Sequence, residues 1–373
     1  MMAVQEQKKE KKEPLFHIVR RTDISTKTKA VIYAIAILAG FLISSLICWA
    51  FGEDATPIDF FASMFTGAFG TKRLIWLLLQ DMALLLGVSV ALVPAFKMKF
   101  WNLGGNGQVL MGCLASIFCM FYFGDLNNVI LIPLMLVASL AAGVLWAAIP
   151  GIFKAYFDTN ESLFTLMLNY IAQGLVAMFI TIWVKSGSGV LSPLSAGNLP
   201  EIGGNRYILI IVVLFLLAGL MYCYLRYTKH GYELTVVGES PNTAKYIGIN
   251  VKAVIIRTLI LSGAIAGLVG FFLAAGINHT VSTASANNMG FTAIMTSWLA
   301  GFNPLLMFAS CFFITFVNRG MQEVRMNFSF ENDSISNIVV GIIYFCVIAV
   351  SFFITYQVVF RKNETKTKAK EEN

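Results

Sequence analysis

The sequence predicts an all-α polytopic membrane protein with about ten transmembrane helices, one of them short or broken. Hydrophobic residues make up 57% of the 373 positions and charged residues only 13%, whereas an ordinary soluble domain has about 25% charged residues. The mean hydropathy is +0.74. The apolar residues also gather in runs of roughly 20, the length of a helix that crosses a bilayer. These runs leave no room for a closed soluble domain between them.

Basic residues gather at the two ends of the chain, which has a net charge of +7. Residues 1–29 hold eight basic and four acidic side chains, and residues 361–373 hold five basic ones. The positive-inside rule therefore predicts two cytoplasmic tails on either side of a transmembrane domain at 30–360. The first of these tails is expected to be disordered as far as Pro14. Because a membrane anchor follows it directly, we expect contact with membrane lipid and none with nucleic acid.

The first half of the chain predicts four spans. The first, second and fourth are expected at about 30–51, 73–94 and 129–153, and the third follows the polar stretch at 101–108 and runs to about 123. The acidic segment 52–72 is expected to be an outside loop. Asp81 lies within the second span, where a carboxylate is costly, so it should face the bundle or lie near the interface. Small residues at spacing four in the fourth span predict close helix packing (Gly143, Ala147 and Gly151).

A polar stretch interrupts the apolar pattern before the third span. It reads Trp101-Asn102-Leu103-Gly104-Gly105-Asn106-Gly107-Gln108. Non-helical backbone at membrane depth is tolerated only inside protein or along a water-filled path. The stretch therefore marks the core of the bundle or the conduit of a transporter. Alternatively, these residues only pack and cap the start of a helix.

The fifth span opens with Asn160 and Glu161, which suit the first turn of a helix. Asn169 follows about nine residues further on, at a depth where a buried amide needs a hydrogen-bond partner. That partner is either a neighbouring helix, the commoner outcome, or a polar solute.

The second half predicts further spans at about 207–227, 254–276 and 335–360 and an apolar run at 305–316. The long Gly- and Ser-rich segment 185–206 is an expected outside docking surface. If both tails lie inside, the number of crossings is even. The short segment 290–302 must then also cross, which makes ten.

The segment 229–252 is polar and lies between two spans. Gly238 can supply a turn, and Glu239 or Ser240 can cap a short helix. Pro241 suits the first position of that helix, and Gly248 is a suitable stop.

This short helix would place Ala244 and Ile247 on one side, three residues apart. A partner that grips such a helix could move the spans on either side of it. The alternative is a solvated loop with a single helical turn.

Several catalytic patterns are missing from the sequence. It contains no Gly-x-x-x-x-Gly-Lys-Ser/Thr phosphate-binding loop and no Gly-x-Ser-x-Gly nucleophile motif. Its three histidines, at positions 17, 230 and 279, are far apart. We therefore expect no metal site, no catalytic site and no ATP site in this chain.

Four segments, in the family's order, resemble the permeases of bacterial ABC importers for simple sugars, branched-chain amino acids and nucleosides. The segments are the polar stretch at 102–108, the run from Asn160 to Ala172, the pattern Gly231-x-x-Leu234-x-Val236-Val237-Gly238-x-x-Pro241-x-x-Ala244-x-x-x-Gly248-Ile249, and the run from Gly290 to Pro304. In the first segment Asn106 stands where the family usually has Glu.

The resemblance implies a type II ABC importer-like permease bundle in the bacterial cell membrane. It implies cytoplasmic ABC ATPase subunits, a second permease chain that is related or identical, and an extracytoplasmic substrate-binding lipoprotein. ATP and Mg would be bound by the ATPase partner, and this chain would need no cofactor. The implied ATPase-coupling residues are Gly238, Glu239, Ser240, Pro241, Ala244, Lys245 and Gly248. The residues expected along the translocation path are Asn102, Asn106, Gln108 and Asn169.

The predicted function is ATP-driven import of a small polar solute, with nucleosides favoured within the family. A simple-sugar permease is the alternative substrate class. An ion-coupled secondary transporter is the alternative mechanism, although few ionisable residues lie in the spans. A membrane enzyme is a third interpretation, but the sequence shows no cluster of His, Asp or Ser residues that would support it. A purely structural subunit would not explain the polar breaks.

Overall fold

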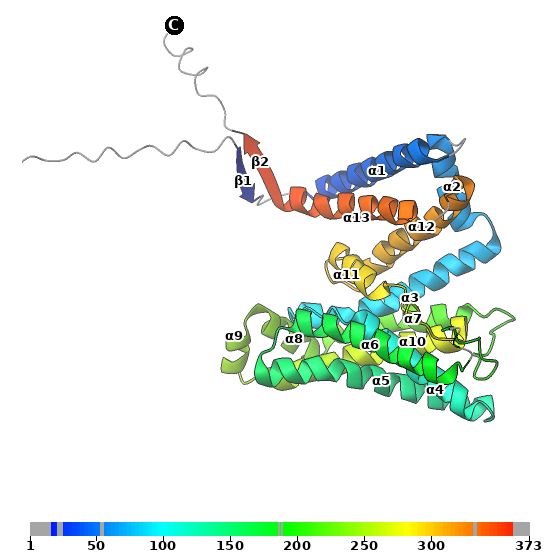
Figure 1. Cartoon of the computed structure of the whole chain (residues 1–373). Coiled ribbons are helices and arrows are strands. Elements are labelled where there is room, and N and C mark those ends of the chain that lie inside the picture. The colour runs from blue at the N-terminus through cyan, green and yellow to red at the C-terminus, as the bar shows by residue number, and fades with distance from the viewer. Residues whose placement is uncertain are drawn as a thin grey trace, which may run out of the picture. The chain divides into compact units, whose positions relative to one another are not determined.

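The computed structural model describes residues 16–20, 25–52, 56–185, 187, 189–330 and 334–360. These residues are mostly helical (Figure 1). The helices are α1 (Thr26–Phe51), α2 (Pro57–Phe69), α3 (Lys72–Lys97), α4 (Gly105–Phe123), α5 (Asn128–Phe157), α6 (Glu161–Trp183), α7 (Ile208–Tyr227), α8 (Lys229–Glu239), α9 (Pro241–Tyr246), α10 (Val251–Leu273), the π-helix η1 (Ala274–Asn278), α11 (Met289–Leu299), α12 (Leu306–Asn327) and α13 (Ser334–Thr355). Two short strands, β1 (Phe16–Arg20) and β2 (Tyr356–Phe360), lie near the ends.

The predicted fold class, an all-α polytopic membrane protein, is confirmed. Within the described ranges, seven helical segments are long and apolar enough to cross a membrane: α1, α3, α4, α5, α6, α7 and α10 with η1. The segment predicted at 290–302 forms the short helix α11, which has 11 residues. The total of ten crossings stays a prediction.

Side-chain caps explain where several of these helices begin. The hydroxyl of Thr71 accepts the Leu74 N–H at 3.2 Å at the start of α3. Asn127, Asn160 and Asn250 cap α5, α6 and α10 in the same way. Each cap satisfies a backbone donor that has no partner within the helix. The predicted cap at Asn160 is therefore confirmed.

The expected outside loop at 52–72 contains the helix α2, so the prediction that it is only a loop was wrong. Thr56 and Asp59 explain this helix. The Thr56 N–H donates to the Asp59 carboxylate at 2.8 Å, and the Asp59 N–H donates to the Thr56 hydroxyl at 3.4 Å. This reciprocal capping begins a helix despite the acidic character of the segment.

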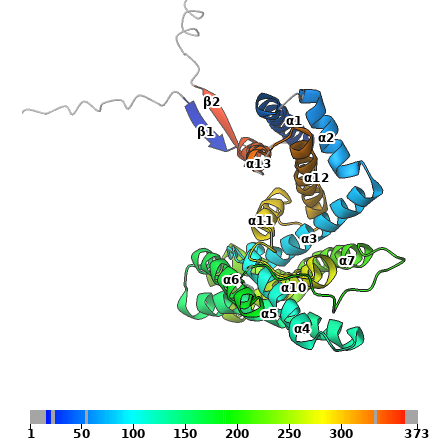
Figure 2. The same ribbon diagram turned by 45° about the vertical axis from the view of Figure 1, so that its right-hand side comes forward.

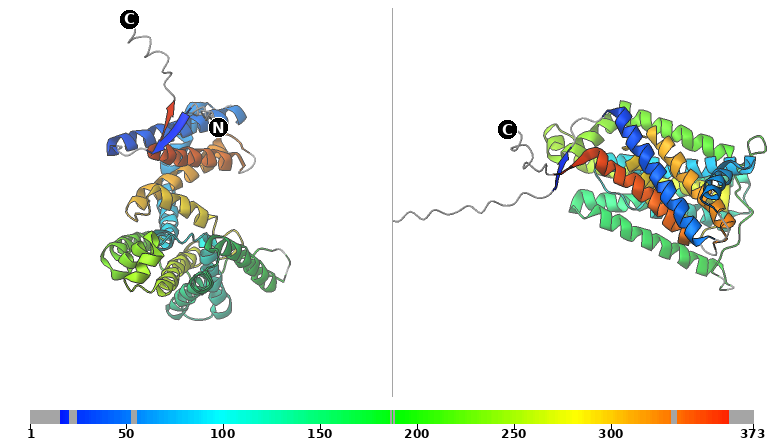
Figure 3. Two further views of the ribbon diagram at one scale, coloured as in Figure 1. Left: turned by 90° about the vertical axis from the view of Figure 1, so that its left-hand side faces the viewer. Right: turned by 90° about the horizontal axis from the view of Figure 1, so that it is seen from above.

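The chain divides into two compact units, one with residues 1–63 and 321–373 and the other with residues 64–320. In the first unit, α1 lies beside α13 (Figures 1 and 3). The Cβ position of Gly40 lies 3.4 Å from the Cβ of Cys346, so a small residue allows this close approach. The amide of Asn327 donates to the Ser63 hydroxyl at 2.9 Å and joins α12 to α2 within the same unit.

The two strands of the first unit pair antiparallel, with Phe16 opposite Phe360 and Arg20 opposite Tyr356. The last span was predicted to run to Phe360, and this boundary is wrong because the helix ends at Thr355. β-branched residues on both strands favour extended backbone. The predicted tail at 1–29 contains β1, and its expected disorder as far as Pro14 lies outside the described residues.

The second unit is centred on α10, which packs against α3, α4 and α5 (Figure 2). Glycines make these contacts close. A Cβ atom on Gly143 or Gly263 would collide with the carbonyl oxygen of the other residue, and one on Gly112 would lie 2.7 Å from the Gly267 Cα. The small-residue stripe predicted on the fourth span is therefore confirmed as a packing face.

Asp81 of α3 pairs with Arg319 of α12 within the second unit. The Asp81 side chain retains 36% of its exposure and the Arg319 side chain 19%. This partner explains how a carboxylate is tolerated inside a predicted span, because an unpaired charge there would be costly. The prediction that Asp81 faces the bundle or lies near the interface fits this geometry.

Candidate functional site

The polar stretch before α4 is a real break in the helical structure. Asn102 is fully buried and holds the break together. Its Oδ1 atom accepts hydrogen bonds from the Gly104 N–H at 3.0 Å and from the Gln108 amide at 3.3 Å. Its Nδ2 atom donates to the Ser262 hydroxyl of α10 at 3.3 Å. Asn102 therefore satisfies the non-helical backbone from within the protein, as membrane depth requires.

Asn169 of α6 also binds this break. Its Oδ1 atom accepts the Gly107 N–H at 2.8 Å, and its Nδ2 atom donates to the Leu103 carbonyl at 2.9 Å. A Cβ atom on Gly107 would lie only 2.9 Å from Asn169 Oδ1, so glycine lets the two helices meet here. The predicted need of Asn169 for a partner is thus met by a neighbouring segment of the same chain.

Asn106 joins the first turn of α4 to the start of α11. Its Oδ1 atom accepts the Gly290 N–H at 2.7 Å, and the residue is buried. A side chain at Gly290 would collide with the Asn106 backbone nitrogen. Two of the segments singled out in the sequence, 102–108 and 290–304, therefore meet at this asparagine.

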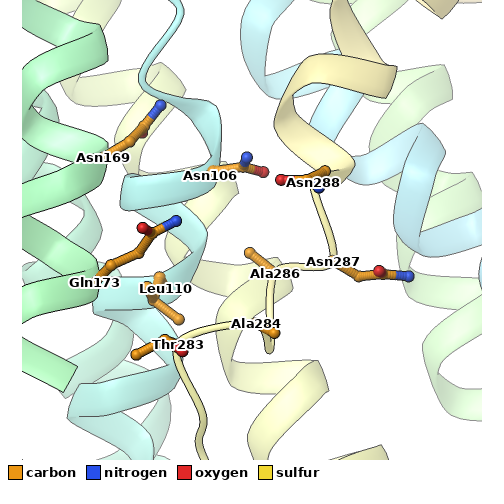
Figure 4. A pocket seen from close by; sticks show the side chains of 9 residues that line it. All are labelled: Asn106, Leu110, Asn169, Gln173, Thr283, Ala284, Ala286, Asn287 and Asn288. Carbon is orange, nitrogen blue, oxygen red and sulfur yellow. The ribbon is translucent and has the colours of Figure 1, made fainter. Parts of the chain in front are cut away.

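A cavity of about 260 Å³ opens beside Asn106 and Asn169. It lies between α4, α6 and the segment that precedes α11, as Figure 4 shows. Nine residues line it, and all are uncharged: Asn106, Leu110, Asn169, Gln173, Thr283, Ala284, Ala286, Asn287 and Asn288. Its volume is near the lower end of ligand pockets, which span about 300–1,000 Å³.

The structure brings together two of the four predicted path residues at this cavity, Asn106 and Asn169. Asn102 and Gln108 are buried next to it and are not among the lining residues. Sequence reasoning missed Gln173 and the residues from Thr283 to Asn288. Gln173 could have been found, because it follows Asn169 by four positions and so shares its helix face.

The backbone around the cavity is unusual. The π-helix η1 extends α10, and π-helical turns occur often at functional sites. Asn287 and Asn288, with φ of 42° and 53°, both adopt the left-handed conformation. Such positions are uncommon for residues other than glycine, although asparagine tolerates them best. The chain between η1 and α11, which includes the wall residues 283–288, therefore has a non-repetitive backbone.

The polar segment 229–252 is more ordered than a loop with a single turn. It begins with the 11-residue helix α8, and Gly238 lies inside this helix rather than at a turn. The predicted turn at Gly238 is therefore wrong. A Cβ atom at this position would collide with the carbonyl oxygen of Lys97 at the end of α3. Gly238 thus serves the close approach of α8 to α3.

The short helix α9 agrees with the predicted capping. The Ser240 hydroxyl accepts the Thr243 N–H at 3.2 Å, and Pro241 occupies the first helical turn. Gly248 has a φ of 84°, which suits glycine after a helix end. Glu239 is exposed and is the last residue of α8.

Ala244 does not lie on an exposed face of α9. It is fully buried, whereas Lys245 is exposed and Tyr246 retains 91% of its exposure. Ala244 and Ile247 were expected on one side of this helix. That expectation is wrong, because Ala244 is turned toward the bundle and Ile247 is exposed. The exposed surface at the end of α9 contains Lys245, Tyr246 and Ile247.

A polar network fastens α8 to α7 and α10. His230 is buried, with Tyr224 on its Nδ1 atom and Thr258 3.3 Å from its Nε2 atom. Glu233 pairs with Arg257 of α10. Burial, and then the positive charge of Arg257, lower the pKa of His230 below its ordinary value of 6.5. The imidazole therefore remains neutral near pH 7.

Among the described residues, no group of three or more His, Cys, Asp or Glu side chains could hold a metal ion. Two features described above have functional potential, the amide-lined cavity and the α8–α9 segment.

Comparison with known proteins agrees with this arrangement. Residues 73–349 match the family described as the branched-chain amino acid transport system / permease component. The chain belongs to this family. The match covers the cavity and the α8–α9 segment together, so both are parts of a permease. The chain is accordingly a multi-pass membrane subunit for transport and not an enzyme.

Several curated relatives are ABC permeases. The nucleoside ABC transporter permease protein NupB of Lactococcus lactis subsp. cremoris is 29% identical over 312 residues, which are 78% of this chain and 84% of the relative. The guanosine ABC transporter permease protein NupP of Bacillus subtilis is 29% identical over 72% of this chain and 78% of its own. The glucose ABC transporter permease protein TsgB13 of Haloferax volcanii is 28% identical over 87% and 88%.

These relatives and the family assign the chain to ABC importer permeases, which work with ATPase and substrate-binding partners. The alternative mechanism, an ion-coupled secondary transporter, is therefore not supported.

Proposed function

We propose that this permease imports nucleosides. Relatives named for nucleosides and guanosine align with most of the chain. The single observation that carries the proposal is the cavity between α4 and α6, whose lining contains amides and a hydroxyl but no charged side chain.

The chemistry of the cavity matches that of a nucleoside. A nucleoside is uncharged, and its base and sugar present both hydrogen-bond donors and acceptors. Asparagine and glutamine amides also carry both kinds of group, so they can replace the solute's water. A charged solute such as a nucleotide would lose its hydration without meeting a counter-charge, which is strongly unfavourable.

The translocation path in this proposal begins at the cavity, with Asn106 and Asn169, and continues past Asn102 and Gln108. All four side chains lie around the broken backbone that precedes α4. Movement of α4 relative to α6 would open this region, because the hydrogen bonds of Asn169 join those two helices.

ATP hydrolysis takes place on partner subunits in this proposal, and they bind the ATP and Mg. The coupling residues are Gly238, Glu239, Ser240, Pro241, Ala244, Lys245 and Gly248. Of these, Glu239 and Lys245 present exposed side chains to the ATPase. Ala244 and Gly238 pack the α8–α9 segment against the bundle, so that a movement of α9 is passed on to α3 and α10.

The complete transporter would contain this chain, a second related or identical permease chain, cytoplasmic ABC ATPase subunits and an extracytoplasmic substrate-binding lipoprotein. We place both termini in the cytoplasm. The support for this orientation is the excess of basic residues in 1–29 and 361–373.

Simple sugars are the second candidate substrate class. The glucose permease of Haloferax volcanii aligns with 87% of this chain, and a sugar is also uncharged and rich in hydroxyl groups. The cavity lining is compatible with either solute.

The deciding experiment is uptake of radiolabelled nucleosides and sugars by a strain that lacks this permease, with and without the restored gene and its ATPase partner. We expect nucleoside uptake that requires both proteins. Sugar uptake alone would replace the proposed substrate, and uptake that persists without the ATPase would contradict the proposed coupling.

A further inference from the structure

The amides around the cavity differ in how much of their hydrogen-bonding capacity the protein already uses. Both polar atoms of the Asn169 side chain are bonded to the backbone before and within α4. The Oδ1 atom of Asn106 is bonded to Gly290, which leaves its Nδ2 group. The side chain of Asn169 therefore already makes hydrogen bonds to the protein through both of its polar atoms, although it lies on the cavity wall.

Gln173 is in the opposite situation. It lies one turn after Asn169 on the same face of α6, and it is half-buried on the cavity wall. Within the described residues its amide has no hydrogen-bond partner. Figure 4 shows its side chain extending from α6 toward the space that Asn106 and Leu110 border.

The facing wall supplies a second amide. Asn288 extends toward Asn106 from the segment that precedes α11, whereas the Asn287 side chain points away from the group (Figure 4). The methyl group of Ala286 and the side chain of Leu110 provide apolar surface between these amides. A flat, partly apolar ring with a polar edge fits such a lining, since apolar walls with a few fixed polar groups orient a ligand.

We propose that Gln173 is the specificity-determining residue of the cavity and reads the hydrogen-bonding edge of a nucleobase, while Asn169 is a positioning residue. This inference rests on the proposed nucleoside transport. The glutamine amide offers one acceptor and two donors, and it can rotate to match either a carbonyl or an amino group on the base. A site that bonds such a group rejects analogues that lack it.

The test uses cells that express the complete transporter and measures uptake of radiolabelled inosine. Unlabelled inosine and purine riboside, which lacks the oxygen at position 6, compete for uptake. We expect the unaltered transporter to prefer inosine by about tenfold or more, and Gln173→Leu to reduce that preference to about twofold or less.

Two further variants make the result specific. Gln173→Asn keeps the amide but shortens the side chain, so we expect a weakened preference even if Gln173→Leu fails to reach the membrane. Thr181→Val is the matched control, because Thr181 lies on the same helix and is exposed, and among the described residues its hydroxyl bonds only to the Ala177 carbonyl. It should leave the preference unchanged.

An unchanged preference in both Gln173 variants would overturn the inference and leave nucleoside transport standing. The same conclusion would follow if unlabelled inosine and purine riboside competed equally well for uptake by the unaltered transporter. Absence of any nucleoside uptake by the unaltered transporter would instead overturn the proposed function, and the inference with it.

Discussion

Asn169 on α6 accepts the backbone N–H of Gly107 on α4 at 2.8 Å, at the point where the non-helical stretch becomes a helix. The same side chain donates to the Leu103 carbonyl at 2.9 Å. One buried amide therefore satisfies two backbone groups, one before α4 and one in its first turn. Its first role is to hold the broken segment in place.

We expect Asn169→Leu to lower the thermal stability of the purified protein. The change leaves the Gly107 N–H and the Leu103 carbonyl unpaired, and each such buried group costs about 1–3 kcal/mol. Thermal unfolding in detergent measures the effect. Met167→Leu, at an exposed position on the same helix, is the control. Full stability combined with lost transport would show that Asn169 acts on the solute instead.

The contact between α5 and α10 should tolerate no added methyl group. A Cβ atom at Gly263 would collide with the Gly143 carbonyl and would lie 2.5 Å from the Ala147 Cβ. We expect Gly263→Ala to destabilise the bundle by about 1–3 kcal/mol, as overpacking does. Gly219→Ala on α7 is the matched control, because no neighbouring atom of the described part of the chain lies within 4 Å of its Cβ position. Equal melting temperatures for the two variants would contradict this packing.

Gly238→Ala should loosen α8 from the end of α3. The added Cβ atom would meet the Lys97 carbonyl, a backbone group that cannot rotate away. We expect faster amide hydrogen exchange in residues 229–239 and reduced ATP-dependent uptake. Gly174→Ala, on α6 with open space around its Cβ position, should change neither. Unaltered exchange in α8 would show that the contact is not maintained in the membrane.

The two sides of α9 should respond differently to substitution. Tyr246→Ala removes an exposed ring and should leave folding intact while weakening association with the ATPase by about tenfold, as loss of an aromatic contact at an interface does. Ala244→Asp places a carboxylate in a fully buried position. We expect this substitution to disrupt the packing of α9 against the bundle.

Co-purification of the ATPase reports on association, and proteolysis near residues 240–248 reports on that packing. Strong ATPase binding by the Tyr246→Ala protein would argue that the partner docks elsewhere.

Acid should weaken the attachment of α8. Burial lowers the pKa of His230 most, and the positive charge of Arg257 lowers it further, whereas the negative charge of Glu233 raises it. As pH falls below about 6.5, the exposed form of α8 takes up a proton before the docked form does. Docking of α8 is therefore most favourable above about pH 6.5 and becomes less favourable as the pH falls. The decline stops below the lowered pKa that His230 has in the docked form.

Hydrogen exchange of residues 229–239 at pH 7.5 and pH 5.5, corrected for the intrinsic rate, measures this decline. His230→Gln removes the titrating group and should reduce the difference between the two pH values. A difference of the same size in the variant would assign the pH dependence to another group.

The sequence by itself determined the membrane class, most helix positions and the capping of α9. These follow from local chemistry: apolar runs of bilayer length, asparagine and threonine caps, and a Ser-Pro start. The family resemblance also came from contiguous residues. The polar break before α4 and the buried amide on α6 could each be marked as unusual from the sequence alone.

Only the tertiary structure decided what those polar residues contact. It joined Asn169 to Gly107, Asn106 to Gly290 and Gln108 to Asn102. It also placed Gln173 on the cavity wall, where its amide has no hydrogen-bond partner among the described residues. It also turned Ala244 inward and paired β1 with a strand at the far end of the chain. In a membrane helix the lipid-facing and bundle-facing sides are both apolar, so sequence periodicity does not distinguish them. The packing of α3, α4, α5 and α10 makes that distinction.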